Sequence, residues 1–195
     1  MPTFQFSDQS RSQTYGRSEG SEKRPSKEMI RSHLENGPDT TIIEASKNGH
    51  IEIVKVMIEK GLDINTLDDV GYTALSYAAL NGYLDVVDLL IEYGADVNVT
   101  NHWGGNALVQ AAFFGHVDIA KILIDNGANM NVTIHGDSLV VYAAKNGFDD
   151  LVEHLINAGA TYKYSKEKLC NGGGEKKTSI FKKWKTKLRN GHKRS

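Results

Sequence analysis

Short amphipathic runs of apolar residues recur along this chain, with a glycine at each end of every run. Two glycine series repeat with steps of 33, 33 and 32 residues: Gly49, Gly82, Gly115 and Gly147, and Gly61, Gly94, Gly127 and Gly159. Between the two glycines of the second repeat, Val86, Val87, Leu90 and Ile91 fall at positions i, i+1, i+4 and i+5. This spacing places them on one stripe of a helix.

A shorter segment before the first glycine of each repeat also has helical character. These segments span residues 74–80, 107–113 and 139–145 and contain pairs of small residues: Ala78-Ala79, Ala111-Ala112 and Ala143-Ala144. Such pairs let helices pack closely. Each repeat is therefore predicted to run helix, tight turn, helix, and then a loop of about ten residues. A unit of this size cannot bury its own apolar face, so the pattern predicts an all-α solenoid of stacked units.

The motifs within the repeats resemble those of the ankyrin repeat family. The second repeat has Gly71-Tyr-Thr-Ala-Leu-Ser-Tyr-Ala-Ala79, then Asn81-Gly82-Tyr-Leu-Asp-Val-Val87, then Gly94-Ala-Asp-Val-Asn98. The resemblance covers residues 37–161 and implies four repeats, at about 37–69, 70–102, 103–135 and 136–161. It implies a module that binds another protein without catalysing a reaction.

The chain departs from the family pattern at the start of each repeat. The family's Thr-Pro-Leu-His tetrapeptide begins here with Thr40, Thr73, Asn106 or Ser138, and its proline and histidine are absent. Each of these four residues can cap a helix N-terminus. The missing proline no longer pre-sets the first helical turn. We expect each lost feature to lower stability by roughly 0.5–1 kcal/mol relative to a consensus array.

The two ends of the chain differ from the repeats in composition. Residues 1–25 are rich in Ser, Gln, Gly and charged residues, which predicts disorder. In residues 26–36, Met29, Ile30, His33 and Leu34 have helical spacing, and we expect a helix that caps the first repeat. The alternative is a binding helix. The repeat pattern stops after Thr161, and residues 162–195 are predicted to form a basic, disordered tail.

Charge is distributed unevenly along the chain. Residues 37–161 carry 5 Lys and Arg against 17 Asp and Glu, whereas residues 162–195 carry 12 against 2. The repeats thus have a net charge of −12 and the tail +10, so an acidic surface favours a basic partner. No apolar run is long enough to span a membrane, and the single cysteine, Cys170, excludes an internal disulfide. We expect an intracellular protein, cytoplasmic or alternatively nuclear.

The family resemblance also implies where a partner would bind. Ankyrin repeats contact partners through their concave side, which is formed by the loop tips and the outward face of the first helices. Seven residues at such positions are candidate partner contacts: Tyr77, Leu80, Trp103, Gln110, Phe113, Phe114 and Tyr142. Large apolar and aromatic side chains on a surface often anchor an interface, and here they could form one continuous patch. The alternative is that some of these rings pack between repeats.

The basic tail contains a second candidate binding segment. Ile180, Phe181, Trp184 and Leu188 have helical spacing. The residues of this segment that we expect to take part in targeting or binding are Lys182, Lys183, Trp184, Lys185, Lys187 and Arg189. This pattern suits a partner groove, an anionic membrane or nucleic acid, and Lys182–Lys185 resembles a nuclear-import signal. The tail could instead be passive, or fold back onto the acidic repeats.

Enzymatic chemistry has no support in the sequence. The seven histidines lack metal-ligand spacing, and no catalytic triad or phosphate-binding loop is present. We therefore expect no catalytic, cofactor or metal site and no small-molecule substrate. The predicted function is protein binding through the concave side of the repeats. The alternative is an adaptor whose tail targets it to the nucleus, nucleic acid or a membrane while the repeats hold cargo.

Overall fold

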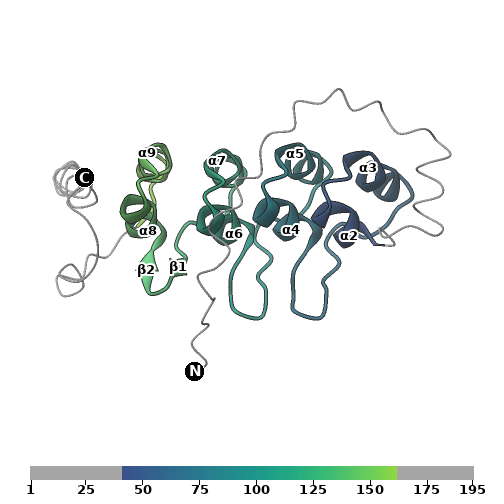
Figure 1. The fold of residues 1–195 in the computed structure, drawn as a ribbon, viewed down its shortest axis with the longest axis horizontal. Coiled ribbons are helices and arrows are strands. Elements are labelled where there is room, and N and C mark those ends of the chain that lie inside the picture. The colour runs from purple at the N-terminus through teal and green to yellow at the C-terminus, as the bar shows by residue number, and fades with distance from the viewer. Residues whose placement is uncertain (1–40, 162–195) are drawn as a thin grey trace.

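The computed structural model describes residues 41–161, and its helices form two rows (Figure 1). The first row contains α2 (Ile42–Lys47), α4 (Ala74–Asn81), α6 (Ala107–Phe114) and α8 (Leu139–Asn146). The second row contains α3 (Ile51–Glu59), α5 (Leu84–Glu92), α7 (Val117–Asp125) and α9 (Asp149–Asn157). The predicted all-α repeat array is confirmed over these residues. The predictions for residues 1–40 and 162–195, including the capping helix and the disordered ends, lie outside the described residues.

Capping residues set the limits of the first-row helices. The side chains of Thr73 and Asn106 accept hydrogen bonds from Ser76 N–H and Val109 N–H, as predicted. The prediction for the first repeat is wrong by one residue, because Thr41 rather than Thr40 is the N-cap. Glu44 decides this position, since it lies at N3 of a helix capped by Thr41 and closes a reciprocal capping box.

The fourth repeat lacks the predicted side-chain cap. Ser138 occupies the N-cap position of α8, but its hydroxyl makes no capping hydrogen bond. Its Oγ is buried without a hydrogen-bond partner within residues 41–161. An unpaired buried hydroxyl destabilises a fold. Of the four first-row helices, α8 is the one whose N-terminus lacks a side-chain capping hydrogen bond.

The core lies between the two rows and continues from repeat to repeat. The alanine pairs of α4, α6 and α8 are almost fully buried, which is why the first-row helices can pack closely. The helical stripes of the second row supply most of the large buried side chains. The largest that are essentially inaccessible are Leu75, Leu90, Leu108, Leu123, Leu139, Leu151 and Leu155.

Asparagines in the loops link each repeat to the next. Asn65 Oδ1 accepts from Asp96 N–H at 2.9 Å, and Asn98 Oδ1 accepts from Asn129 N–H at 2.7 Å. Asn131 continues the series, 33 residues after Asn98, and accepts from the backbone N–H at position 161. Backbone donors that would otherwise be left without a partner in the loops are thus satisfied by the neighbouring repeat.

Rings at the start of the second-row helices pack on glycines of the preceding repeat. A Cβ added at Gly49 would lie 2.8 Å from the ring of Tyr83, and one at Gly82 would lie 2.5 Å from the ring of His116. Phe148 has the same relation to Gly115. These glycines therefore allow a close approach between repeats as well as ending a helix.

The loop between the third and fourth repeats differs from the others. In the two preceding loops, Asp68 and Asn101 fold a turn by accepting two backbone hydrogen bonds each. The equivalent residue is Ile134, whose side chain cannot accept. Here the chain forms a short antiparallel hairpin of β1 (Thr133–Ile134) and β2 (Asp137–Ser138). Its turn has positive φ at both central residues, as a two-residue hairpin of this type requires.

Candidate protein-binding surface

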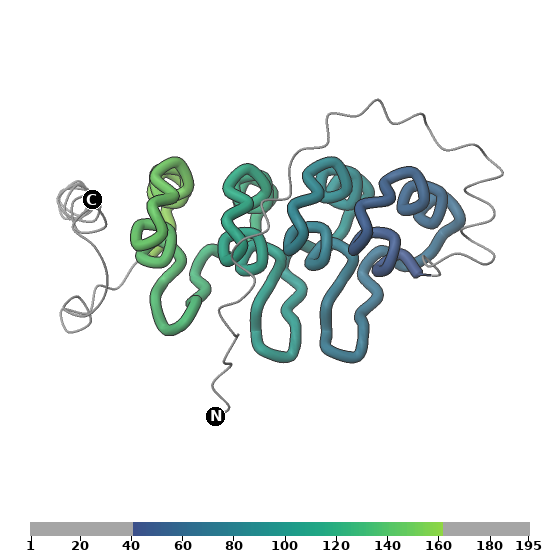
Figure 2. The backbone as a smooth tube through the Cα atoms, in the orientation of Figure 1, coloured from purple at the N-terminus to yellow at the C-terminus, as the bar shows by residue number. Residues whose placement is uncertain are grey.

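The loops between repeats project beyond the first row of helices (Figure 2). The loops before α4 and α6 extend farthest, and the β1–β2 hairpin points the same way. We call this side, formed by the first-row helices and the projecting loops, the first-helix face. Six of the seven sequence-predicted contacts lie on α4, α6 or α8, and Trp103 lies in the loop before α6.

One group of aromatic residues gathers between the second and third repeats. The ring centroids of Tyr72 and Tyr77 are 5.0 Å apart, and those of Tyr72 and Trp103 are 6.2 Å apart with a tilt of 57°. Asn101 holds the Trp103 turn by accepting from the N–H groups of Trp103 and Gly105 at 3.0 and 2.9 Å. The position of Trp103 is therefore fixed by its own loop.

Asp68 connects this group to the loop before α4. Its carboxylate accepts from Tyr72 N–H at 2.8 Å, from Val70 N–H at 3.0 Å and from the Tyr77 hydroxyl at 2.8 Å. Partial burial acts to raise the pKa of Asp68, but these hydrogen bonds outweigh it and hold the pKa below its ordinary value. The carboxylate therefore stays ionised at neutral pH.

The two tyrosines respond to the same surroundings in the opposite direction. Burial, with the hydrogen bond to Asp68, raises the pKa of Tyr77 to about 12. Burial also raises the pKa of Tyr72, although hydrogen bonding with Asn101 opposes the shift. Both phenols are neutral in the physiological range, so this group carries only the charge of Asp68.

A second group of rings lies between the third and fourth repeats. Phe113 stacks on Tyr142 with centroids 6.2 Å apart and planes inclined at 16°. Phe114 and His135 contact Phe113 edge-on, at 5.2 and 5.5 Å. The Tyr142 hydroxyl donates to the backbone oxygen of Phe113 at 3.3 Å. The hairpin that carries His135 is tied to α8 by Lys145, whose Nζ is 2.6 Å from Asp137 Oδ2.

Exposure divides the seven predicted contacts into three classes. Trp103 and Phe114 are exposed, at 52% and 44%. Tyr77, Leu80 and Phe113 are half-buried. The structure places Gln110 and Tyr142 largely inside, at 9% and 8%, because Tyr142 packs between repeats against Phe113. The single continuous patch, and the contact of each residue with a partner, stay predictions.

Sequence reasoning missed Tyr72. It directly precedes the N-cap Thr73, a position that the repeat pattern gave no reason to select. The available signal was Asp68, because an aspartate four residues before an aromatic residue in a turn can accept its backbone N–H. The contact between the rings of Tyr72 and Tyr77 depends on how the loop before α4 folds onto that helix.

The described part of the chain is strongly acidic. Residues 41–161 contain 5 Lys and 16 Asp and Glu, a net charge of −11. One of the lysines, Lys47, places its Nζ 5.3 Å from the ring centroid of Tyr77. The described part of the chain thus combines exposed aromatic side chains with an overall negative charge.

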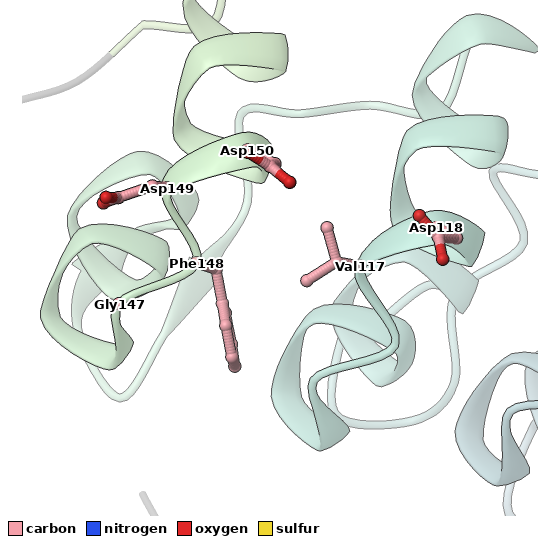
Figure 3. A pocket seen from close by; sticks show the side chains of 6 residues that line it. All are labelled: Val117, Asp118, Gly147, Phe148, Asp149 and Asp150. Carbon is pink, nitrogen blue, oxygen red and sulfur yellow. The ribbon is translucent and has the colours of Figure 1, made fainter.

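An open cleft of about 460 Å³ lies at the start of the second-row helices of the last two repeats (Figure 3). Val117 and Asp150 point toward the opening, while Asp118 and Asp149 lie on its outer sides. None of the seven predicted contacts lines this cleft. Asp150 Oδ2 lies 4.0 Å from Nζ of Lys121 on the neighbouring repeat.

Among residues 41–161, no three His, Cys, Asp or Glu side chains come together as metal ligands would. None of the helices in that same range has both the length and the apolar character needed to cross a bilayer. The predicted tail contacts, Lys182 to Arg189, lie outside the described residues, and their roles stay predictions.

His116 makes the stability of the array depend on pH. Burial lowers the pKa of His116, and a hydrogen bond to Leu80 opposes the shift without overcoming it. Its Nε2–H donates to the Leu80 backbone oxygen at 3.0 Å. The folded state favours the neutral ring, so as pH falls the unfolded chain takes up the proton first. This contribution is complete above the ordinary pKa of 6.5 and is lost as pH falls from there toward the lowered value.

We therefore expect the thermal midpoint of the protein to fall between pH 7.5 and pH 5. The His116→Tyr variant should lose less over the same range, because Tyr83 fills the equivalent position one repeat earlier and has no charge to gain. Melting curves of both proteins at the two pH values provide the measurement. Equal losses would show that His116 does not titrate with folding.

Comparison with known families agrees with the geometry. A family model described as ankyrin repeats (3 copies) matches residues 22–101 and again residues 95–166. A comparison with curated proteins found no match.

Proposed function

The chain belongs to the ankyrin repeat family, and from this premise we propose that it binds a protein partner non-covalently through its first-helix face. Ankyrin repeats are generally protein–protein interaction modules. The observation that carries the choice of face is the presence there of Trp103 and Phe114, two large rings exposed to solvent. Exposed rings of this kind are common energetic anchors of interfaces.

The rest of the face supports these two anchors. Tyr77, Leu80 and Phe113 present part of their surface beside them. Tyr142 fixes Phe113 from behind through stacking and a hydrogen bond. The net charge of −11 favours a partner with a basic surface, since complementary charge speeds association and excludes acidic competitors. The mechanism is recognition by a preformed surface.

Matched substitutions test this proposal. Proteins captured from cell extract by the wild type should be lost with Phe114→Ala and retained with Tyr93→Ala. Phe114 and Tyr93 are exposed to the same degree, 44% and 43%, but Tyr93 caps the end of the second-row helix α5. Loss of the same proteins by both variants, or by neither, would contradict binding at the first-helix face.

For a captured partner, Trp103→Ala should weaken binding by about 1 kcal/mol or more, roughly fivefold. Its effect on the free energy of unfolding should stay within about 0.5 kcal/mol, because half of the side chain is already in water. Phe113→Ala should lower both affinity and stability, since it removes the stack on Tyr142. Calorimetric titration and urea unfolding measure the two effects, and a large stability loss with unchanged affinity for Trp103→Ala would remove it from the interface.

A further inference from the structure

Three rings and one carboxylate meet between the second and third repeats. They belong to Asp68, Tyr72, Tyr77 and Trp103, which we call the Trp103 cluster. The carboxylate is bound to the Tyr77 hydroxyl at 2.8 Å, and the Tyr72 ring lies between the other two, at 5.0 and 6.2 Å. The proposed role of the repeats as a binding module does not yet give this arrangement a specific task.

The rings offer a place for a cation. The face of an aromatic ring is negative and attracts an ammonium group within about 6 Å of its centroid. The centroids of Tyr72 and Trp103 are 6.2 Å apart and the rings are inclined at 57°, so one ammonium can lie within that distance of both. Trp103 is 52% exposed, so part of its side chain contacts solvent.

The carboxylate adds the matching charge. Asp68 forms no ion pair within residues 41–161, so no lysine or arginine of the described chain neutralises it. Hydrogen bonds from two backbone groups and one phenol hold it in place. A fixed carboxylate beside aromatic faces favours a cation over a neutral group.

The chain itself already places one ammonium against another ring of the cluster. Lys47 Nζ lies 5.3 Å from the ring centroid of Tyr77, within the range of a cation–π contact. Lys47 also forms no salt bridge within the described residues. In the free protein, the cluster thus holds a lysine of the neighbouring repeat against one of its rings.

We propose that the Trp103 cluster is the subsite that receives the ammonium group of a lysine side chain of the partner. The incoming lysine would lie over Tyr72 and Trp103 beside Asp68. The charge of Lys47, held at the Tyr77 ring of the same cluster, would repel it. This inference rests on the proposed function, because it names the partner group that one part of the first-helix face recognises. It predicts that removal of the repelling charge of Lys47 strengthens binding, which damage to the fold would not do.

The test uses the full chain and small probes of defined chemistry. The indole N–H resonance of Trp103 is followed by nuclear magnetic resonance, and a Trp103→Phe spectrum distinguishes it from that of Trp184. The probes are Nα-acetyl-lysine methylamide, its trimethylammonium form, and the uncharged norleucine analogue. Both ammonium probes should shift the resonance saturably, while norleucine at the same concentration should not.

Variants then separate the charge from the rings. Lys47→Met should tighten binding of the lysine probe by about two- to fivefold, because it removes a like charge from the same cluster. Lys55→Met removes the same charge from an exposed position on α3 and should leave binding unchanged. Asp68→Asn should weaken binding at least about threefold. Asn101 accepts the same two backbone hydrogen bonds at the equivalent position, so asparagine is compatible with this turn.

Each outcome decides the proposal. Equal shifts with norleucine and lysine, or equal effects of Lys47→Met and Lys55→Met, would overturn it. Binding of the trimethylammonium probe alone would assign the subsite to methylated lysine, still an ammonium recognised by the rings, and so support it. If no probe binds while Phe114→Ala still abolishes partner capture, the subsite is refuted and the proposed function stands. Probe binding without any effect of Phe114→Ala on capture would refute the proposed function instead.

Discussion

Leu108→Ala should lower the free energy of unfolding by about 3 kcal/mol, within the range of 2–5 kcal/mol found for buried leucines. Leu108 lies in α6 and is completely buried in the core that runs between the repeats. Alanine would remove its packed atoms and leave a cavity. Each repeat is stabilised by its neighbours, so a defect in an inner repeat weakens contacts on both of its sides.

Urea unfolding followed by helical circular dichroism measures this loss. Leu67→Ala is the matched control, because Leu67 is an exposed leucine in the loop before α4 and its removal should change stability by less than about 0.5 kcal/mol. Similar midpoints for the two variants would contradict the continuous core between the two rows.

The periodic parts of this fold could be predicted from sequence because they repeat. The repeat pattern predicts a helix over residues 74–80, and the helix runs Ala74–Asn81. The extra residue is Asn81, which stays helical because Gly82 takes the left-handed conformation at the C-cap. The alanine pairs were expected to allow close packing, and they are buried.

Features that depend on one local residue escaped the periodic argument. A fixed step of 33 from Thr73 selects Thr40 as the first N-cap, but Glu44 moves the cap to Thr41. The same step gives Ile134 where the two earlier loops have Asp68 and Asn101, and there the chain forms a hairpin that the repeat pattern does not predict. In each case, side-chain hydrogen bonding decides the local fold.

The sequence predicts which residues lie at the candidate surface, but it does not predict how exposed each of them is. Tyr77, Gln110 and Tyr142 occupy equivalent positions, yet Tyr77 is half-buried whereas Tyr142 is almost inaccessible. The difference comes from the neighbouring repeat, since Phe113 supplies a ring on which Tyr142 stacks. Likewise, Asn98 was part of a recognised motif, but its bond to Asn129 spans 31 residues and becomes visible only when the repeats are stacked.

Gly82→Ala should be more destabilising than the same change at Gly94, although both glycines have nearly the same left-handed backbone, with φ of 81° and 84°. A side chain in this conformation costs about 1–2 kcal/mol at either site. At Gly94 nothing lies within 4 Å of the added Cβ, whereas at Gly82 the Cβ would lie 2.5 Å from His116 Cε1. The ring would have to move away from its place between the repeats.

That movement adds a second cost at Gly82 alone. His116 would lose the hydrogen bond to the Leu80 backbone oxygen, a contribution of about 1 kcal/mol, together with its packing. We therefore expect Gly82→Ala to lower the free energy of unfolding by about 3 kcal/mol and Gly94→Ala by about 1–2 kcal/mol. Urea unfolding of both variants measures the difference.

A double-mutant cycle identifies the source of that difference. In a His116→Ala background, Gly82→Ala should cost no more than Gly94→Ala, because the ring that the new methyl group would displace is gone. If the excess cost at Gly82 persists without the ring, the contact between Gly82 and His116 is not what joins the second and third repeats here. If it disappears, the glycine after each first-row helix has two roles: it ends the helix, and it makes room for the ring of the next repeat.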